Sequence, residues 1–461
     1  MDISSPTSTQ NDIRTQSRKK EAKDIQCIIM ENIQLHALTK KPLCDAWLKC
    51  IDGSTDPDNQ KPLDILVLVC LHDIFSKKRS VENILKNKIR NGLLTEAFFR
   101  QVVTDYTSVI KKYFPSLISI CDTLLRSPES VISNFAISMY NETFICFVSG
   151  DTYYQQEIIG DLISKVGTGG GGLITDGALR TLEKLAENHS KELVVFTTMI
   201  TAMMDFTENM NLGQFRQLMH ILCTLAWQPD TSESGSLQTE INIMIKKQIC
   251  SKSPVLKKMG VIAVVNAVRA MGKSYVPGNT TRLSNTTTDS SNPHPISKQA
   301  KLIMKMIDLT ITETKQFPEA AGLFMDELAS PASISEMPDE IAVECSSRFQ
   351  DKFEVEFVED YVKDKTENAG LQLPIKLDFN IDEYEPEADL MDKDSGEIAI
   401  PISRWVLESK KNPLALRTEM FRFIPHFRLM GAIKKSNSEE SEIDALLGLF
   451  VKNLFNLENY K

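Results

Sequence analysis

Apolar residues recur at helical spacing through most of this sequence of 461 residues, and this pattern limits the folds open to the chain. The stretch QFRQLMHILCTLAW, residues 214–227, is typical. Its Phe215, Leu218 and Leu222 are separated by three and four residues and so share one face of a helix. Similar patterns predict a succession of helices of about 10–18 residues, without an alternating pattern long enough to build a sheet. The sequence therefore predicts an all-α fold.

Helices joined by short turns bury their apolar faces against their neighbours in the sequence. We therefore expect an irregular α-solenoid of stacked antiparallel helical pairs, with two disordered or acidic loop insertions. A chain of 461 residues is too long for a single simple core, which also favours a repeat array or several domains. The sequence has no exact repeat period, but irregular helical repeats seldom show one.

Two polar segments interrupt the predicted array. SYVPGNTTRLSNTTTDSSNPHPIS, residues 274–297, is poor in apolar residues, so it cannot offset the entropy lost on ordering. Residues 378–400 are strongly acidic and form the second break. The predicted segments are a disordered N-terminal tail (1–26), a helical solenoid with a basic region (27–273), a flexible polar loop (274–297), a helical continuation (298–377), an acidic loop (378–400) and a helical C-terminal segment (401–461).

Basic residues are clustered, although the formal net charge of the chain is −10. Residues 241–288 contain no aspartate or glutamate, and residues 77–90 form a second basic cluster. Such lysines can neutralise phosphates without reading bases, whereas solvated helix faces explain the same composition equally well. The candidate DNA-facing lysines of the acid-free window are Lys246, Lys247, Lys252 and Lys257.

The common catalytic and metal-binding motifs are missing from the sequence. The six histidines never show His-Glu-x-x-His spacing, and the GxGxxG pattern that begins at Gly167 follows a predicted helix where a nucleotide-binding fold needs a strand. The nine cysteines are scattered, which is typical of reduced thiols. We therefore predict a non-enzyme with no catalytic, cofactor-binding or metal-binding residues. Without a signal peptide or an apolar run of about 20 residues, we also expect an intracellular protein with no membrane segment.

Several short segments together resemble one known family. They are LKNKIRNG (85–92), DTYYQQEIIGDL (151–162), LMHILCTLAW (218–227), LFMDELAS (323–330) and SEIDALLGL (441–449). These segments occur in the order found in the Fanconi anaemia group D2 family, and the resemblance extends from about residue 25 to about residue 450. Members of that family are much longer, so this chain resembles their central portion.

The resemblance implies a nuclear α-solenoid protein that pairs with the group I paralogue in the repair of DNA interstrand crosslinks. It implies monoubiquitination on one lysine by a ubiquitin-conjugating enzyme and a RING-type ligase of the Fanconi core complex. It also implies that the modified pair forms a clamp on double-stranded DNA. Lys258, which is followed by MGVIAVV, matches the acceptor position best, and Lys257 is the neighbouring alternative. The rival interpretation is a general helical-repeat scaffold or adaptor that binds peptides or proteins.

The residues around Lys258 suit an acceptor in one physical respect. Amide transfer from a thioester requires an uncharged amine, and a lysine surrounded by cations loses its proton more readily than one paired with a carboxylate. The acid-free window of residues 241–288 predicts such surroundings. Met259, Ile262 and Val265 lie at helical spacing and would anchor the following helix in a core.

Overall fold

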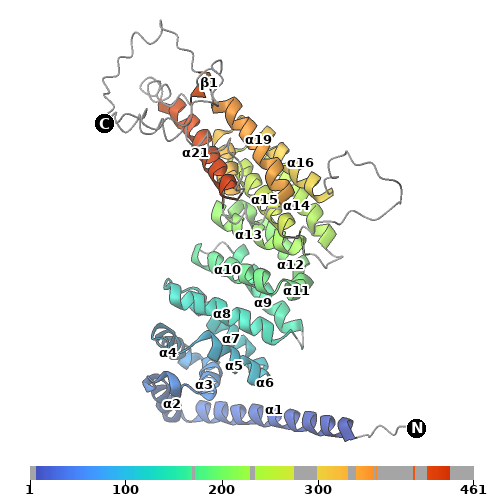
Figure 1. The fold of residues 1–461 in the computed structure, drawn as a ribbon. Helices are drawn as coiled ribbons and strands as arrows, with labels where there is room; N and C mark the ends of the chain where they lie inside the picture. Colours follow the sequence, from blue (N-terminus) through green and yellow to red (C-terminus); the bar gives the residue numbers. More distant parts are fainter. Residues whose placement is uncertain are drawn as a thin grey trace, which may run out of the picture. The chain divides into compact units, whose positions relative to one another are not determined.

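The computed structural model describes residues 7–148, 150, 152–168, 172–228, 234–274, 298–330, 339–357, 359–360, 398–399 and 413–436. Within these residues, the only strands are β1 (Glu359–Asp360) and β2 (Ile398–Ala399), which form a short antiparallel pair. The predicted all-α class, built from helices stacked on one another, is confirmed (Figure 1). The chain divides into two compact units, residues 1–228 and 229–461.

The first unit is a succession of helices in which each packs mainly on its near neighbours in the sequence. Helix α8 packs on α7 and α10, and α10 in turn packs on α9 and α13. The helices are α1 (Thr7–Thr39), α2 (Lys41–Gly53), α3 (Pro62–His72), α4 (Lys78–Arg90), α5 (Glu96–Asp105), α6 (Thr107–Lys112), α7 (Phe114–Leu125), α8 (Ser130–Cys146), α9 (Thr152–Gly167), α10 (Gly172–Asn188), α11 (Ser190–Leu193), α12 (Thr197–Thr201) and α13 (Leu212–Ala226). Short 3₁₀ helices lie at Pro57–Asn59, Phe75–Lys77, Val194–Phe196 and Ala202–Asn209.

Helix α13 shows how sequence determines an element of this unit. Its start is fixed by a capping box between Asn211 and Gln214. The Asn211 side chain accepts a hydrogen bond from the backbone N–H of Gln214 at 2.9 Å. The Gln214 side chain in turn accepts one from the backbone N–H of Asn211 at 3.2 Å. The apolar stripe predicted from the sequence is buried, including Phe215, Leu218 and Leu222. Burial of this stripe holds α13 against α10.

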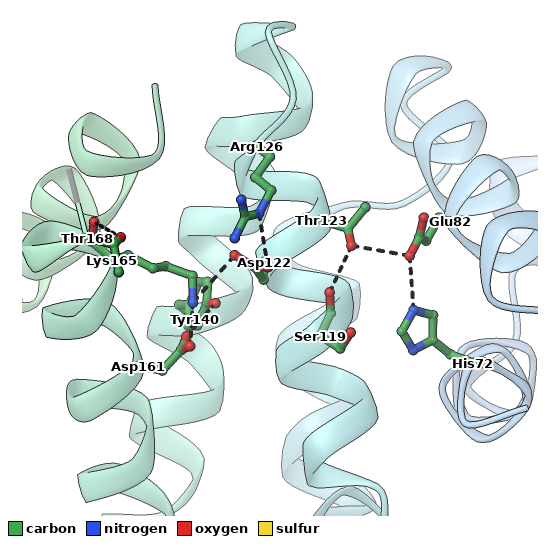
Figure 2. A network of polar contacts seen from close by, with 10 residues as sticks. All are labelled: His72, Glu82, Ser119, Asp122, Thr123, Arg126, Tyr140, Asp161, Lys165 and Thr168. Atoms are coloured by element: carbon green, nitrogen blue, oxygen red, sulfur yellow. Dashed lines mark hydrogen bonds and ion pairs between the residues drawn. The ribbon is translucent and has the colours of Figure 1, made fainter. Parts of the chain in front are cut away.

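A partly buried polar network ties α7, α8 and α9 together (Figure 2). The Lys165 ammonium of α9 forms ion pairs with Asp161 one turn earlier and with Asp122 of α7, the latter at 3.5 Å. The Tyr140 hydroxyl of α8 donates to Asp161 at 2.9 Å, and Arg126 pairs with Asp122 at 3.1 Å. Because Lys165 is buried, its ion pairs with Asp161 and Asp122 offset the free-energy cost of removing its charge from water.

The described residues of the second unit form α14 (Ser234–Ile249), α15 (Pro254–Lys273), α16 (Lys298–Thr314), α17 (Pro318–Leu328), α19 (Asp339–Phe357), α21 (Pro413–Ser436) and the β1–β2 pair. Helix α15 contacts α14, α16 and α17, and α21 packs on α17 and α19 (Figure 1). Because α15 is covered on several sides, its run of apolar residues from Met259 to Val268 is buried almost without interruption.

The structure differs from the sequence-based segments at the N-terminus. Helix α1 begins at Thr7, inside the predicted disordered tail of residues 1–26. The later turns of α1 pack on α3 and α6. Residues can be added to the N-terminal end of this helix without a new nucleation step, so the helix extends into the predicted tail. The division between the units falls at 228/229, inside the single solenoid predicted for residues 27–273. The polar loop 275–297 and most of the acidic loop, residues 378–397, lie outside the described residues.

Helices within the described residues are too short or too polar for any of them to span a bilayer.

Candidate acceptor-lysine site

The site lies where α15 begins, in the second unit. Ser253 is the N-cap residue, and Pro254 occupies the first turn, where its missing N–H breaks no hydrogen bond. Lys257 and Lys258 follow in the next turn of the helix. Consecutive residues on an α-helix point about 100° apart, so the two lysines face different surroundings.

Lys257 points into the second unit and is buried, with only 2% of its side chain exposed. Its Nζ donates hydrogen bonds to the carbonyl oxygens of Ile249 at 2.5 Å and Glu313 at 2.9 Å. Ile249 ends α14 and Glu313 lies in the last turn of α16, where backbone carbonyls have no partner within the helix. The ring of Phe317 lies 4.7 Å from the same Nζ. Lys257 therefore caps the C-terminal ends of two helices.

This placement corrects the prediction that Lys257 faces DNA. A phosphate contact requires an ammonium group at the surface, and that of Lys257 is buried and already bonded to two carbonyl oxygens. The same placement separates Lys257 from Lys258 as candidates for modification, because a reagent would have to displace both bonds to reach the Lys257 amine.

Lys258 points toward the start of α17 and keeps 27% of its side chain exposed. Its Nζ forms an ion pair with the carboxylate of Glu319, which lies in the first turn of α17. The hydrogen bond from Lys258 is the main cause that lowers the pKa of Glu319 below its usual value. Both residues border a groove of about 350 Å³, whose other lining residues are Pro254, Gln316, Phe317, Pro318, Ala320, Leu414, Arg417, Thr418 and Phe421.

The expectation that the acid-free window leaves Lys258 among cations is wrong. The window describes neighbours in the sequence only, and the fold brings carboxylates to it from other helices. Glu319 pairs with Lys258, and the carboxylate of Glu313 lies 3.8 Å from the Lys257 ammonium. Glu319 is the partner of Lys258 that sequence reasoning missed. Its position directly after Pro318 marks a helix start, but nothing in the sequence shows which lysine that start approaches.

The remaining candidate DNA-facing lysines are exposed. Lys246 and Lys247 lie in the last turn of α14, and Lys252 lies in the turn that leads to α15. Within the described residues, none of the three forms an ion pair with a carboxylate. Their charges are therefore available to an anionic partner, in contrast to the charge of Lys257.

The second basic cluster, residues 77–90, offers less free charge than its sequence indicates. Lys88 is buried and donates to the carbonyl oxygen of Ser54 at 3.1 Å and to Gln60 at 2.7 Å. Its burial lowers the pKa of its ammonium group. Lys77 forms an ion pair with Asp45, and Arg90 forms two hydrogen bonds with Glu129. Three basic residues of this cluster are thus used inside the first unit.

Comparison with known proteins identifies the family. Residues 5–459 match the family model described as Fanconi anaemia protein FancD2 nuclease. The chain is 28% identical over 422 residues to the Fanconi anemia group D2 protein of Gallus gallus, an alignment that covers 89% of this chain and 28% of the relative. It is 25% identical to the homologues of Rattus norvegicus, with 96% of this chain and 30% of the relative covered, and of Drosophila melanogaster, with 86% and 27% covered.

The chain thus spans less than a third of the length of these curated relatives. The family match nevertheless covers nearly all of the chain, and the five sequence segments that resemble this family fall within the matched residues. The chain belongs to the FancD2 family of Fanconi anaemia proteins.

Proposed function

We propose that this chain carries the ubiquitin-acceptor lysine of a FancD2-family DNA-repair protein and that the acceptor is Lys258. The observation that carries the proposal is the different placement of two adjacent lysines. Lys258 has a partly exposed side chain at the edge of a groove, whereas Lys257 is buried and holds two helix ends. The buried helix α15 fixes the position of the acceptor amine relative to the surface.

The chemistry is nucleophilic attack by the Lys258 amine on the ubiquitin thioester carried by the conjugating enzyme. A C–N bond forms at the thioester carbonyl carbon and the C–S bond breaks, so the enzyme's cysteine leaves as a thiolate. The proton lost by the attacking amine passes to a base or to solvent. Because Glu319 pairs with Lys258, the lysine must leave this carboxylate before it can attack.

The surface beside Lys258 supports docking of the modifying enzymes. Val255 and Leu256 precede the acceptor on α15 with 62% and 38% of their surface exposed, and Leu414 at the groove is 70% exposed. Exposed apolar side chains beside a groove are typical of contact surfaces. We propose that the conjugating enzyme and the RING-type ligase of the Fanconi core complex approach α15 over these residues.

We further propose that the chain pairs with the Fanconi anaemia group I protein and that the modified pair forms a clamp on double-stranded DNA in the nucleus, during interstrand crosslink repair.

Lys246, Lys247 and Lys252 are the lysines we assign to DNA phosphates. Replacing all three by glutamine should lower the slope of log affinity against log salt by about 2–3, since each phosphate contact contributes about 0.9. An unchanged slope in a filter-binding titration would remove these residues from the DNA contact.

We propose a non-catalytic role, although the description of the family model includes the word nuclease. The proposal is supported by the lack of the common catalytic motifs in the sequence. In this role the chain is the substrate of the ubiquitin-transfer enzymes.

The test is a reconstituted ubiquitination reaction with the chain, the group I protein, the conjugating enzyme, the ligase and double-stranded DNA. The native chain should gain one ubiquitin, and Lys258→Arg should gain none. Lys305→Arg on α16 is the matched control, because Lys305 is exposed and has no role assigned in DNA contact, and this variant should be modified normally. Modification that persists in Lys258→Arg would place the acceptor elsewhere. A native chain that stays unmodified beside a working full-length control would favour the helical-repeat scaffold interpretation.

A further inference from the structure

A separate group of polar side chains lies between α10 and α13 in the first unit. Glu183 and Glu187 are four residues apart on α10, and Gln217 and His220 are three residues apart on α13. Residues at these spacings share one helix face, so both pairs lie where the two helices pack together. The sequence contains no His-Glu-x-x-His or similar metal motif because the ligand types are divided between two helices.

The four side chains already contact one another in two cross-helix pairs. His220 Nε2 lies 3.2 Å from Oε1 of Glu187, and Gln217 Nε2 donates to Oε2 of Glu183 at 3.2 Å. One ligand atom each from Glu183, Glu187 and His220 can be chosen so that all three lie within 4.8 Å of one another. Gln217 could add its amide oxygen by rotation about its last side-chain bond, because amide O and N exchange places on such a flip.

The group carries negative charge that no basic residue neutralises directly. Within the described residues, neither Glu183 nor Glu187 forms an ion pair with a lysine or arginine. Lys184, the neighbour of Glu183, donates instead to the hydroxyl of Ser138 on α8 at 3.1 Å. A bound cation would neutralise both carboxylates.

We propose that α10 and α13 together bind one divalent transition-metal ion of the zinc class, held by Glu183, Glu187 and His220. An imidazole nitrogen combined with carboxylate oxygens suits zinc and its first-row neighbours, whereas Mg²⁺ and Ca²⁺ favour oxygen ligands alone. Zinc lies about 2.0–2.2 Å from such ligands and prefers a tetrahedral arrangement, so two of its ligand atoms lie about 3.3–3.6 Å apart. The three ligand atoms lie within 4.8 Å of one another, and side-chain rotations must bring them to this spacing when the ion binds.

Bound metal would cross-link two helices that are 33 to 37 residues apart in the sequence, as the positions of Glu183, Glu187 and His220 show. An ion that binds the folded state stabilises it by mass action, so metal should raise the unfolding temperature of the first unit. Helix pairs that project carboxylates and a histidine at i, i+3 or i, i+4 spacing are a common way of holding a metal between helices.

The test is calorimetric titration of Zn²⁺ into the full chain, in which the exposed Cys50 and Cys250 are replaced by serine to remove competing thiolates. The variants Glu187→Gln and His220→Gln keep side-chain size and hydrogen-bonding capacity but remove a ligand each. Glu157→Gln on α9 and His36→Gln on α1 are matched controls, because both side chains are exposed and lie outside the group.

We expect one equivalent of Zn²⁺ in the native chain and in both controls, with affinity at least about tenfold weaker in each ligand variant. Zinc should also raise the unfolding temperature of the native chain and leave that of the two ligand variants nearly unchanged. A native chain that binds no Zn²⁺ at one equivalent, or ligand variants that bind it as tightly as the controls do, would overturn the proposal.

Discussion

The two adjacent lysines at the start of α15 have different surroundings because a helix turns by about 100° per residue. Lys257 faces the ends of α14 and α16, and its ammonium satisfies carbonyl groups that would otherwise lack partners. Lys258 faces the groove beside α17. The sequence predicted a basic helix start and named both residues. It could not separate them, because the partners that distinguish them, Glu313 and Glu319, are more than 50 residues away.

Removing the Glu319 carboxylate should speed modification of Lys258. In Glu319→Gln the lysine loses its ion pair, so its amine is freed for attack more often. Exposed ion pairs are weak, and we expect the rate of ubiquitin transfer to rise between about 1.5- and 5-fold. Glu327→Gln, farther along α17, is the control and should leave the rate unchanged. A slower reaction in Glu319→Gln would show instead that this carboxylate assists the transfer, for example as a proton acceptor.

Acid should destabilise the chain partly through His426 on α21. This imidazole is buried, and its Nε2 lies 2.8 Å from the carbonyl oxygen of Phe349. Burial lowers its pKa from the ordinary 6.5 to about 4. Between these two values the unfolded chain binds a proton that the folded chain does not. Stability is therefore present in full above pH 6.5 and falls by about 3 kcal/mol as the pH drops to 4.

The variant His426→Gln isolates this contribution, because glutamine can still donate to the Phe349 carbonyl and does not titrate. Urea unfolding of both chains at pH 7 and pH 4.5 should show a smaller loss of stability in the variant. Equal losses in the two chains would contradict the assignment of this pH dependence to His426.

At the scale of elements, close helix contacts depend on glycine. Gly322 lies on α17, and a Cβ atom at this position would collide with the backbone carbonyl oxygen of Phe421 on α21. Gly260 on α15 plays a similar part, since its Cβ would lie 2.8 Å from the backbone nitrogen of Ile249. The helix packing around Lys258 thus depends on two residues without side chains.

The substitution Gly322→Ala should destabilise the second unit by about 2–3 kcal/mol, because α17 and α21 must move apart. Gly431→Ala is the control on α21 itself. An added Cβ there meets no atom within 4 Å, so the variant should be as stable as the native chain or up to about 1 kcal/mol more stable. Equal stability of the two variants in urea unfolding would show that α17 and α21 do not pack as closely as described.

The sequence predicted helices well, because the spacing of apolar residues and often a capping residue are present within each helix's own local sequence. Phe215, Leu218 and Leu222 were placed in the core of α13 on this basis, and they lie there. The β1–β2 pair was not predicted, because a two-residue strand leaves no readable alternation. The extension of α1 to Thr7 was also missed, because helix propagation depends on an anchor elsewhere in the helix.

At the scale of the whole molecule, the chain forms two compact units, residues 1–228 and 229–461. We expect fragments 1–228 and 229–461, produced separately, each to show a helical circular-dichroism spectrum and a cooperative thermal transition. The polar network around Lys165 lies wholly within the first fragment, so it should persist there. A fragment 1–228 that melts without a cooperative transition would show that it depends on the second unit.

The central claim is that Lys258 is available for reaction in the folded chain while Lys257 is not. The most direct measurement is a brief pulse of an amine-acetylating reagent on the native chain, followed by quantification of the label at each lysine by peptide mass spectrometry. Lys258 should be labelled at a rate within about tenfold of exposed lysines such as Lys252. Lys257 should be protected by about 100-fold or more, because its amine becomes accessible only when its helix ends open. Equal labelling of Lys257 and Lys258, or protection of Lys258, would contradict this account.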